Sequence, residues 1–141
     1  MEDCIFCRIV RGFEPASIVY SDEKVLTFTD IQPVNLGHVL IIPKGHVAQL
    51  SELDEETGAQ MFRVAMRISA SLRRSEVKCE GINLLLADGE AACQGVFHVH
   101  LHVIPRFRGD DFGVRFGPHY CLRPDKGELD RIALSIRKGM L

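Results

Sequence analysis

The chain has 141 residues, of which 46% are hydrophobic and 26% charged, a composition that predicts one globular domain with a buried core. Its formal net charge is -2 with acidic and basic residues interleaved, which argues against a broad surface for nucleic acid or anionic membrane. The sequence contains neither a basic, apolar leader nor a run of about 18 apolar residues. We therefore expect a soluble, cytoplasmic protein with no nucleic-acid or membrane partner.

The cysteines are five in number, so they cannot all pair: Cys4, Cys7, Cys79, Cys93 and Cys121. With no sign of secretion, metal ligands or free thiols explain them better than a disulfide framework. The Cys4-x-x-Cys7 spacing lets two thiolates meet one zinc ion at about 2.3 Å. A redox pair is the alternative, but that motif needs a preceding strand, and only three residues precede Cys4.

The first third of the chain predicts three short strands. Residues 19–20 and 24–29 form two of them, joined by the turn residues Ser21, Asp22 and Glu23. Residues 33–37 then break the chain, and the β-branched, apolar run 38–42 predicts a buried third strand that ends at Pro43.

The pattern changes to a helical period at Asp54, a candidate N-cap. Met61, Ala65, Ile68 and Leu72 make one apolar stripe, which predicts a helix that ends near Ser75. Residues 82–87 predict a fourth strand and residues 88–89 a turn. The fifth strand is then a histidine-rich run, paired antiparallel with the fourth.

The last part of the chain predicts a loop over residues 108–124 and a second amphipathic helix. Asp125 begins this helix with Glu128 three residues on, and its stripe contains Leu129, Ile132, Ala133 and Ile136. We expect the function of this helix to be packing against the rest of the protein.

The histidine-rich run alternates His98, His100 and His102 with Val99, Leu101 and Val103. In a strand, alternate side chains share a face, so the three imidazoles would share one and the aliphatic residues the other. Surface histidines are the plain alternative, but a strict period of two argues against it. His98 and His102 would lie about 13 Å apart, too far to ligate one metal together. We therefore expect the three to have different roles.

Four features together resemble the histidine-triad (HIT) nucleotide hydrolases: the Cys4-x-x-Cys7 pair, residues 37–44, Ala92-Cys93-Gln94, and residues 98–106. The resemblance covers residues 3–115. It implies a HIT-like fold of the α+β class: a five-stranded antiparallel sheet with one long central helix and a C-terminal helix, in a homodimer whose sheet is continuous. Residues 1–115 would be the HIT-like domain, and residues 116–141 an extension whose helix packs on that domain.

The resemblance also implies hydrolysis, or nucleotidyl transfer, at the α-phosphorus of a purine nucleotide conjugate. Dinucleoside polyphosphates and nucleoside phosphoramidates are the implied substrates. His100 would be the nucleophile that forms a covalent nucleotidyl-histidine, His102 would donate a hydrogen bond to phosphate or leaving group, and His38 would support them. Since the ordinary pKa of histidine is about 6.5, the neutral imidazole that such an attack needs is abundant near neutral pH.

Two further sets of residues follow from the resemblance. Structural zinc would be held by Cys4, Cys7, His46 and His98, a closed tetrahedral set; metal-free thiols are the alternative. The substrate would be bound by apolar residues for the base, a carboxylate for the ribose and a loop for the phosphate: Phe6, Ile9, Phe28, Asp30, Ile31, Gln94, Gly95 and Val96.

Three positions depart from the family pattern. Many relatives have Gly where this chain has Cys93, Ser or Thr where it has Gly95, and Asn or Gln where it has Ala87. A nucleotide-binding or scaffold protein with weak catalysis is therefore one alternative. A zinc hydrolase with His100 and His102 as ligands is another. A zinc finger is the weakest, because the four candidate ligands spread over most of the chain.

Overall fold

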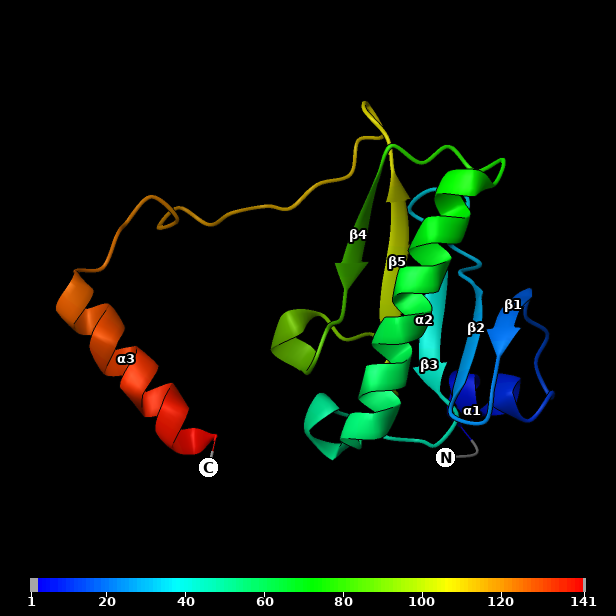
Figure 1. Cartoon of the computed structure of the whole chain (residues 1–141), viewed down its shortest axis with the longest axis horizontal. Helices are drawn as coiled ribbons and strands as arrows, with labels where there is room; N and C mark the ends of the chain where they lie inside the picture. Colours follow the sequence, from blue (N-terminus) through cyan, green and yellow to red (C-terminus); the bar gives the residue numbers. More distant parts are fainter. Residues whose placement is uncertain (1–2, 141) are drawn as a thin grey trace. The chain divides into compact units, whose positions relative to one another are not determined.

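The computed structural model describes residues 3–140, which divide after Asp111 into two compact units. The first unit contains a five-stranded sheet and two helices (Figure 1). Its elements are α1 (Ile5–Val10), β1 (Ile18–Ser21), β2 (Val25–Thr29), β3 (Val39–Pro43), α2 (Glu55–Arg74), β4 (Gly81–Leu85) and β5 (Leu101–Arg106). Single helical turns lie at Leu50–Glu52 and Glu90–Ala92. The second unit contains α3 (Lys126–Gly139).

The sheet has the order β1-β2-β3-β5-β4, and every neighbouring pair is antiparallel. The predicted α+β class and five-stranded antiparallel sheet are confirmed, as is the pairing of the fourth strand with the fifth. Because β5 lies between β3 and β4, residues from the end of the chain's first unit lie inside the sheet and not at its edge. That position brings the histidine-rich run next to β3.

Helix α2 matches its prediction closely. The Asp54 side chain accepts a hydrogen bond from the Thr57 amide, and the chain leaves the helix at Ser75. The predicted stripe is buried against β2, β3 and β5. This helix covers one face of the sheet (Figure 1).

The middle strand of the sheet, β3, is buried on both faces. Val39 and Ile41 of β3 point into the core under α2, whereas Leu40 and Ile42 pack with Phe6 of α1. Leu40 lies opposite His102 in the β3–β5 register, and Val39 lies opposite Val103. Since paired residues share a face, His102 lies on the face of the sheet opposite α2. The functional site is therefore built on the α1 side.

Two sequence-based expectations need correction. Residues 5–10 form a helix that was not predicted, with Cys4 at its N-cap position. The histidine-rich run is also only partly a strand, because β5 begins at Leu101. Val99 still points into the core under α2, but its amide donates to the carbonyl of Val47 outside the sheet ladder. His98 and His100 thus lie on an irregular segment that leads into the strand.

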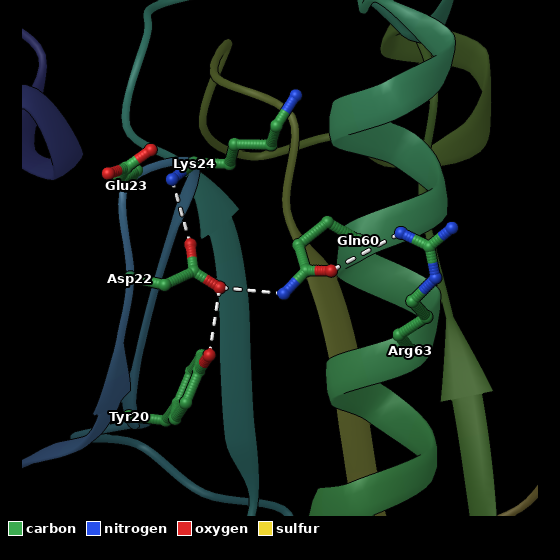
Figure 2. A pocket seen from close by; sticks show the side chains of 6 residues that line it. All are labelled: Tyr20, Asp22, Glu23, Lys24, Gln60 and Arg63. Atoms are coloured by element: carbon green, nitrogen blue, oxygen red, sulfur yellow. Dashed lines mark hydrogen bonds between the residues drawn. The ribbon is translucent and has the colours of Figure 1, made fainter.

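Asp22 ties the β1–β2 turn to α2, as Figure 2 shows. One carboxylate oxygen accepts from the Lys24 and Val25 amides, and the other accepts from the Tyr20 hydroxyl and the Gln60 side chain. Burial opposes the charge, but the four donors outweigh it and lower the pKa of Asp22 to about 2. Both carboxylate oxygens of Asp22 are thus used in hydrogen bonds that hold the turn against α2.

The second unit confirms the predicted C-terminal helix. The Asp125 side chain accepts from the Glu128 amide and caps α3. The packing of this helix on the rest of the protein stays a prediction. Among residues 3–140, no helix combines the length and apolar character needed to cross a bilayer.

Candidate functional site

Four side chains from three parts of the chain converge beside α1. Cys4 and Cys7 come from the start of the chain, His46 follows β3, and His98 precedes β5. Nδ1 of His98 lies 3.5 Å from Sγ of Cys4, 3.6 Å from Sγ of Cys7 and 3.2 Å from Nδ1 of His46. Nδ1 of His46 lies 3.3 Å from Sγ of Cys7. The structure therefore brings together the four predicted metal ligands.

This cluster fits tetrahedral zinc. With bonds of about 2.3 Å to sulfur and 2.05 Å to nitrogen, tetrahedral geometry sets neighbouring S and N ligands about 3.5 Å apart and two N ligands about 3.3 Å apart. The observed separations run from 3.2 to 3.6 Å. A set of two thiolates and two imidazoles with no fifth donor is typical of a structural site.

The far side of the His98 ring is also suited to a metal ligand. Its Nε2 lies 2.8 Å from the carbonyl oxygen of Pro43, which can only accept, so Nε2 carries the proton. Nδ1 is then unprotonated and presents a lone pair to the cluster. His98 is fully buried, and burial lowers its pKa, which also favours the neutral ring.

His100 has the opposite tautomer. Its Nδ1 lies 2.8 Å from the carbonyl oxygen of His98 and must donate to it, so Nε2 carries the lone pair. Within residues 3–140, no buried side-chain nitrogen or oxygen lacks a partner, and no hydrogen bond involves this Nε2. Nε2 is therefore accessible, and His100 lines a cavity. The arrangement presents an unprotonated imidazole nitrogen to anything bound there.

His102 and His38 form a second group beside His100. The rings of His100 and His102 lie 4.9 Å apart, and Nε2 of His38 lies 2.9 Å from Nδ1 of His102. The Asp30 carboxylate lies 3.7 Å from His38 Nε2, beyond hydrogen-bond distance. Burial, with smaller contributions from His100 and His38, lowers the pKa of His102 to about 4. Burial likewise lowers the pKa of His38, against the pull of Asp30.

The cavity beside these histidines has a volume of about 410 Å³ and a mainly apolar lining. Eight of the predicted catalytic and substrate-binding residues line it: Phe6, Ile9, Phe28, Asp30, Ile31, Val96, His100 and His102. Ile5, Glu14, Pro15, Ala16, Thr29 and Leu40 also line it and were missed by sequence reasoning. Pairing of Ser17 with Thr29 brings the segment before β1 to the cavity, and a strand-by-strand pairing argument could have found it.

The loop before the histidines contains Gln94 and Gly95, which are not among the residues that line the cavity. The Gln94 side chain donates to the carbonyls of Ala48 and Val96 and accepts from the Gly89 amide, so it braces the loop. A phosphate contact by Gln94 or Gly95 stays a prediction. Cys93 has a φ of 64°, in the left-handed region that favours glycine. This conformation is consistent with the Gly that the family resemblance implies at this position.

Comparison with known proteins decides the family. The model of the HIT domain matches residues 11–109, more than half of the chain. The chain belongs to the HIT family. The "Protein hit" of Bacillus subtilis is similar in sequence, with 42% identity over 99% of this chain and 95% of its own.

Two other members bear on the site of this HIT protein. The crystal structure of a zinc-bound histidine triad protein from Mycobacterium smegmatis has 40% identity and a TM-score of 0.76, covering 99% of each chain. The adenosine 5'-monophosphoramidase hnt1 of Schizosaccharomyces pombe is 35% identical over 87% of this chain and 89% of its own.

Proposed function

We propose that this HIT protein hydrolyses purine nucleotide conjugates at the α-phosphorus, through a covalent nucleotidyl-histidine on His100. The observation that carries the proposal is the orientation of the His100 ring. Its Nδ1–H donates a hydrogen bond to the His98 carbonyl, and its Nε2 is accessible at the cavity wall. A nucleophile needs that free lone pair. The phosphoramidase activity named for the S. pombe relative supports the same reaction class.

The proposed reaction has two displacements. Nε2 of His100 attacks phosphorus, an N–P bond forms, and the bond from phosphorus to the leaving amine or phosphate breaks. The leaving group departs with the bonding electron pair and takes up a proton. Water then attacks the same phosphorus, the N–P bond breaks, and a nucleoside monophosphate and one proton are released. His102 stabilises the charge on the phosphoryl oxygens by hydrogen bonding.

The order of strands supports a matching order of base, ribose and phosphate. Thr29 bonds to Ser17, Asp30 bonds to the His38 carbonyl, and Leu40 lies opposite His102. Neighbouring strands lie about 4.8 Å apart, so Ala16 and His102 are separated by about 14 Å across the sheet. The apolar end of the cavity near Ala16 and Phe28 would bind the base, and the histidines at the other end would bind the phosphate. Asp30 lies between these two ends and would accept hydrogen bonds from the ribose hydroxyls.

Cys4, Cys7, His46 and His98 would hold zinc as a structural ion. When bound, it supplies a fixed link between the first residues and the segment that leads into β5. The consequence for the reaction is positional. The His98 carbonyl that fixes the His100 tautomer belongs to a ligand residue, so the cluster would hold that carbonyl in place.

The test is turnover of adenosine and guanosine 5'-phosphoramidates and dinucleoside polyphosphates, with release of nucleoside monophosphate as the readout. We expect turnover by the parent protein and a loss on the order of 10⁴-fold or more in kcat for His100→Ala. His119→Ala is the matched control, because His119 is an exposed histidine of the second unit. Quenching during turnover in alkaline denaturant, which preserves the acid-labile N–P bond, should trap labelled nucleotide on the parent and not on His100→Ala.

Retained activity in His100→Ala would exclude the nucleophile. Tight binding of nucleoside monophosphate without turnover of any substrate would favour the nucleotide-binding or scaffold alternative. Activity that needs zinc at His100 would favour a zinc hydrolase. Among the described residues, however, two clusters could hold a metal, and His100 belongs to neither.

We also propose a homodimer in which the sheet continues across β4. This strand is at the edge of the sheet, and its Leu84 and Leu85 are 40% and 50% exposed. On α2, Phe62 and Met66 lie one turn apart and are 55% and 62% exposed. Exposed edges and apolar patches of this kind mark association surfaces. Leu84→Lys should shift the mass measured by light scattering from dimer to monomer; an unchanged dimer would exclude this edge.

A further inference from the structure

The Val34 backbone amide faces the buried His38 ring, and this contact determines where the protons lie on two histidines. The amide nitrogen of Val34 donates to Nδ1 of His38 at 3.1 Å. A backbone amide can only donate, so Nδ1 of His38 must be the unprotonated nitrogen. A neutral imidazole carries one proton, and on His38 it therefore lies on Nε2.

The proton position propagates to His102. Nε2 of His38 lies 2.9 Å from Nδ1 of His102, and with its proton it donates to that nitrogen. Nδ1 of His102 is then an acceptor, and the single proton of neutral His102 lies on Nε2. Within residues 3–140, no hydrogen bond involves this Nε2 and no buried side-chain nitrogen is unpaired, so it is accessible at the cavity that His102 lines.

We propose that the Val34 amide, acting through His38, holds His102 as a neutral imidazole whose Nε2 proton faces the cavity. His38 is thus a positioning residue. The proposal deepens the proposed function, since the cavity side of His102 is where the phosphate would bind.

The same contact excludes the charged form of the pair. A second proton on His38 would place Nδ1–H against the Val34 N–H. A second proton on His102 would turn Nδ1 into a donor toward His38 Nε2, whose proton would then have to move to His38 Nδ1 and meet the same amide. The charged and titratable groups that face the pair are the Asp30 carboxylate, 3.7 Å from His38 Nε2, and the His100 ring, 4.9 Å from the His102 ring. The low pKa values of His38 and His102 agree with this arrangement.

The consequence for catalysis is specific. Neutral His102 can donate a hydrogen bond from Nε2 to a phosphoryl oxygen, but it has no readily released proton for the leaving group. The proton that the leaving group takes up would then come from solvent. His102 would act through charge stabilisation alone.

Long-range ¹H–¹⁵N correlation of the ring nitrogens in ¹⁵N-labelled, zinc-loaded protein at pH 7 tests the proposal without substrate. We expect unprotonated Nδ1 and protonated Nε2 on both His38 and His102. A proton on Nδ1 of either ring would overturn the proposal. Failure of turnover would count against the proposed function only, so the two failures are distinguishable.

Variants test the role of the Val34 amide. Val34→Pro removes the N–H, and Val34→Ala is the control that keeps it. We expect the Nδ1-protonated tautomer of His102 to appear in Val34→Pro alone; identical spectra for both variants would overturn the role of the amide.

His38→Gln and His38→Phe give a second comparison that does not depend on Val34→Pro folding. The Gln side chain can still donate to His102 Nδ1, whereas Phe fills the space without a donor. We expect kcat to fall about 10- to 100-fold for Phe with little change in KM, and Gln to restore most of it. Equal kcat values for the two folded variants, with equal His102 tautomers, would overturn the positioning role.

Discussion

Two clusters of this protein bring metal-binding side chains together, but a backbone carbonyl contacts a histidine of one and a backbone amide contacts a histidine of the other. In the first cluster, made of Cys4, Cys7, His46 and His98, the Pro43 carbonyl accepts a hydrogen bond from His98 Nε2–H, which leaves Nδ1 unprotonated and able to bind a metal. In the second, made of Asp30, His38 and His102, the Val34 amide uses the His38 Nδ1 lone pair, so His38 Nε2 must keep its proton. Convergence alone would make both clusters metal sites. The backbone group on the far side of the ring distinguishes the metal ligand from the hydrogen-bond donor.

The largest expected effect comes from removing a ligand of the first cluster. Cys7→Ser should abolish zinc binding and lower the melting temperature by on the order of 10 °C or more, because the proposed structural zinc would bind the folded chain and not the unfolded one. Zinc content by mass spectrometry and thermal unfolding by circular dichroism check it. Cys121→Ser, which changes an exposed cysteine outside the cluster, should alter neither quantity. Loss of zinc with an unchanged melting temperature would refute a structural role.

The next largest expected effect is a loss of stability on changing Gly37, which lies in the turn that brings the Val34 amide to the His38 ring. Gly37 has a φ of 96°, and an added Cβ would lie 2.7 Å from Cγ1 of Val77. Gly37→Ala should lower the free energy of unfolding by about 2 kcal/mol and leave zinc binding intact.

Gly12→Ala is the matched control for Gly37→Ala. Gly12 has a φ of 80° but nothing within 4 Å of an added Cβ, so Gly12→Ala should lower the free energy of unfolding by only about 1 kcal/mol. Equal losses in urea denaturation of the two variants would show that the contact with Val77 is unimportant.

The sequence predicts most of the fold and the residues of the first cluster, but not the hydrogen bond that distinguishes the second. Periods of 3.6 and 2 are sufficient to find α2 and the strands, because burial of side chains on one face leaves a trace in the residue order. Helix α1 left no such trace: it has six residues, no side-chain cap and no acidic residue in its first turn. The spacing of Cys4 and Cys7 indicated two candidate metal ligands, whereas His46 and His98 followed from the family resemblance. The Val34 amide could not be predicted, since every residue except proline has that donor and only the fold shows where it points.

His102 of the second cluster should make the stability of the protein depend on pH below pH 6.5. His102 titrates near its ordinary pKa of 6.5 when unfolded and at about 4 when folded. Below pH 6.5 the unfolded chain therefore takes up a proton that the folded one does not, and stability is lost as the pH falls from 6.5 toward 4.

Comparison of the parent with His102→Asn isolates this contribution, because the other groups that titrate are common to both proteins. After allowance for solvent screening, we expect the parent to lose about 1 kcal/mol more than His102→Asn over that range in urea denaturation. A loss of equal size in both proteins would mean that His102 keeps its ordinary pKa in the fold.

The smallest expected effect is a gain. Cys93 adopts the left-handed backbone conformation without being glycine, and it precedes the Gln94 that braces the loop. Cys93→Gly should raise the free energy of unfolding by about 0.5 to 1 kcal/mol in chemical denaturation, since glycine adopts this conformation without strain. A loss of stability would show that the Cys93 side chain makes a compensating contribution.

The contrast between the two clusters is tested most directly by anomalous scattering at the zinc edge from crystals grown with excess zinc. We predict one strong peak per chain, among Cys4, Cys7, His46 and His98, and no peak between His38 and His102. A second peak of comparable height bonded to His38 Nε2 and His102 Nδ1 would contradict the account, because it would show that the Val34 amide does not hold a proton on His38 Nε2.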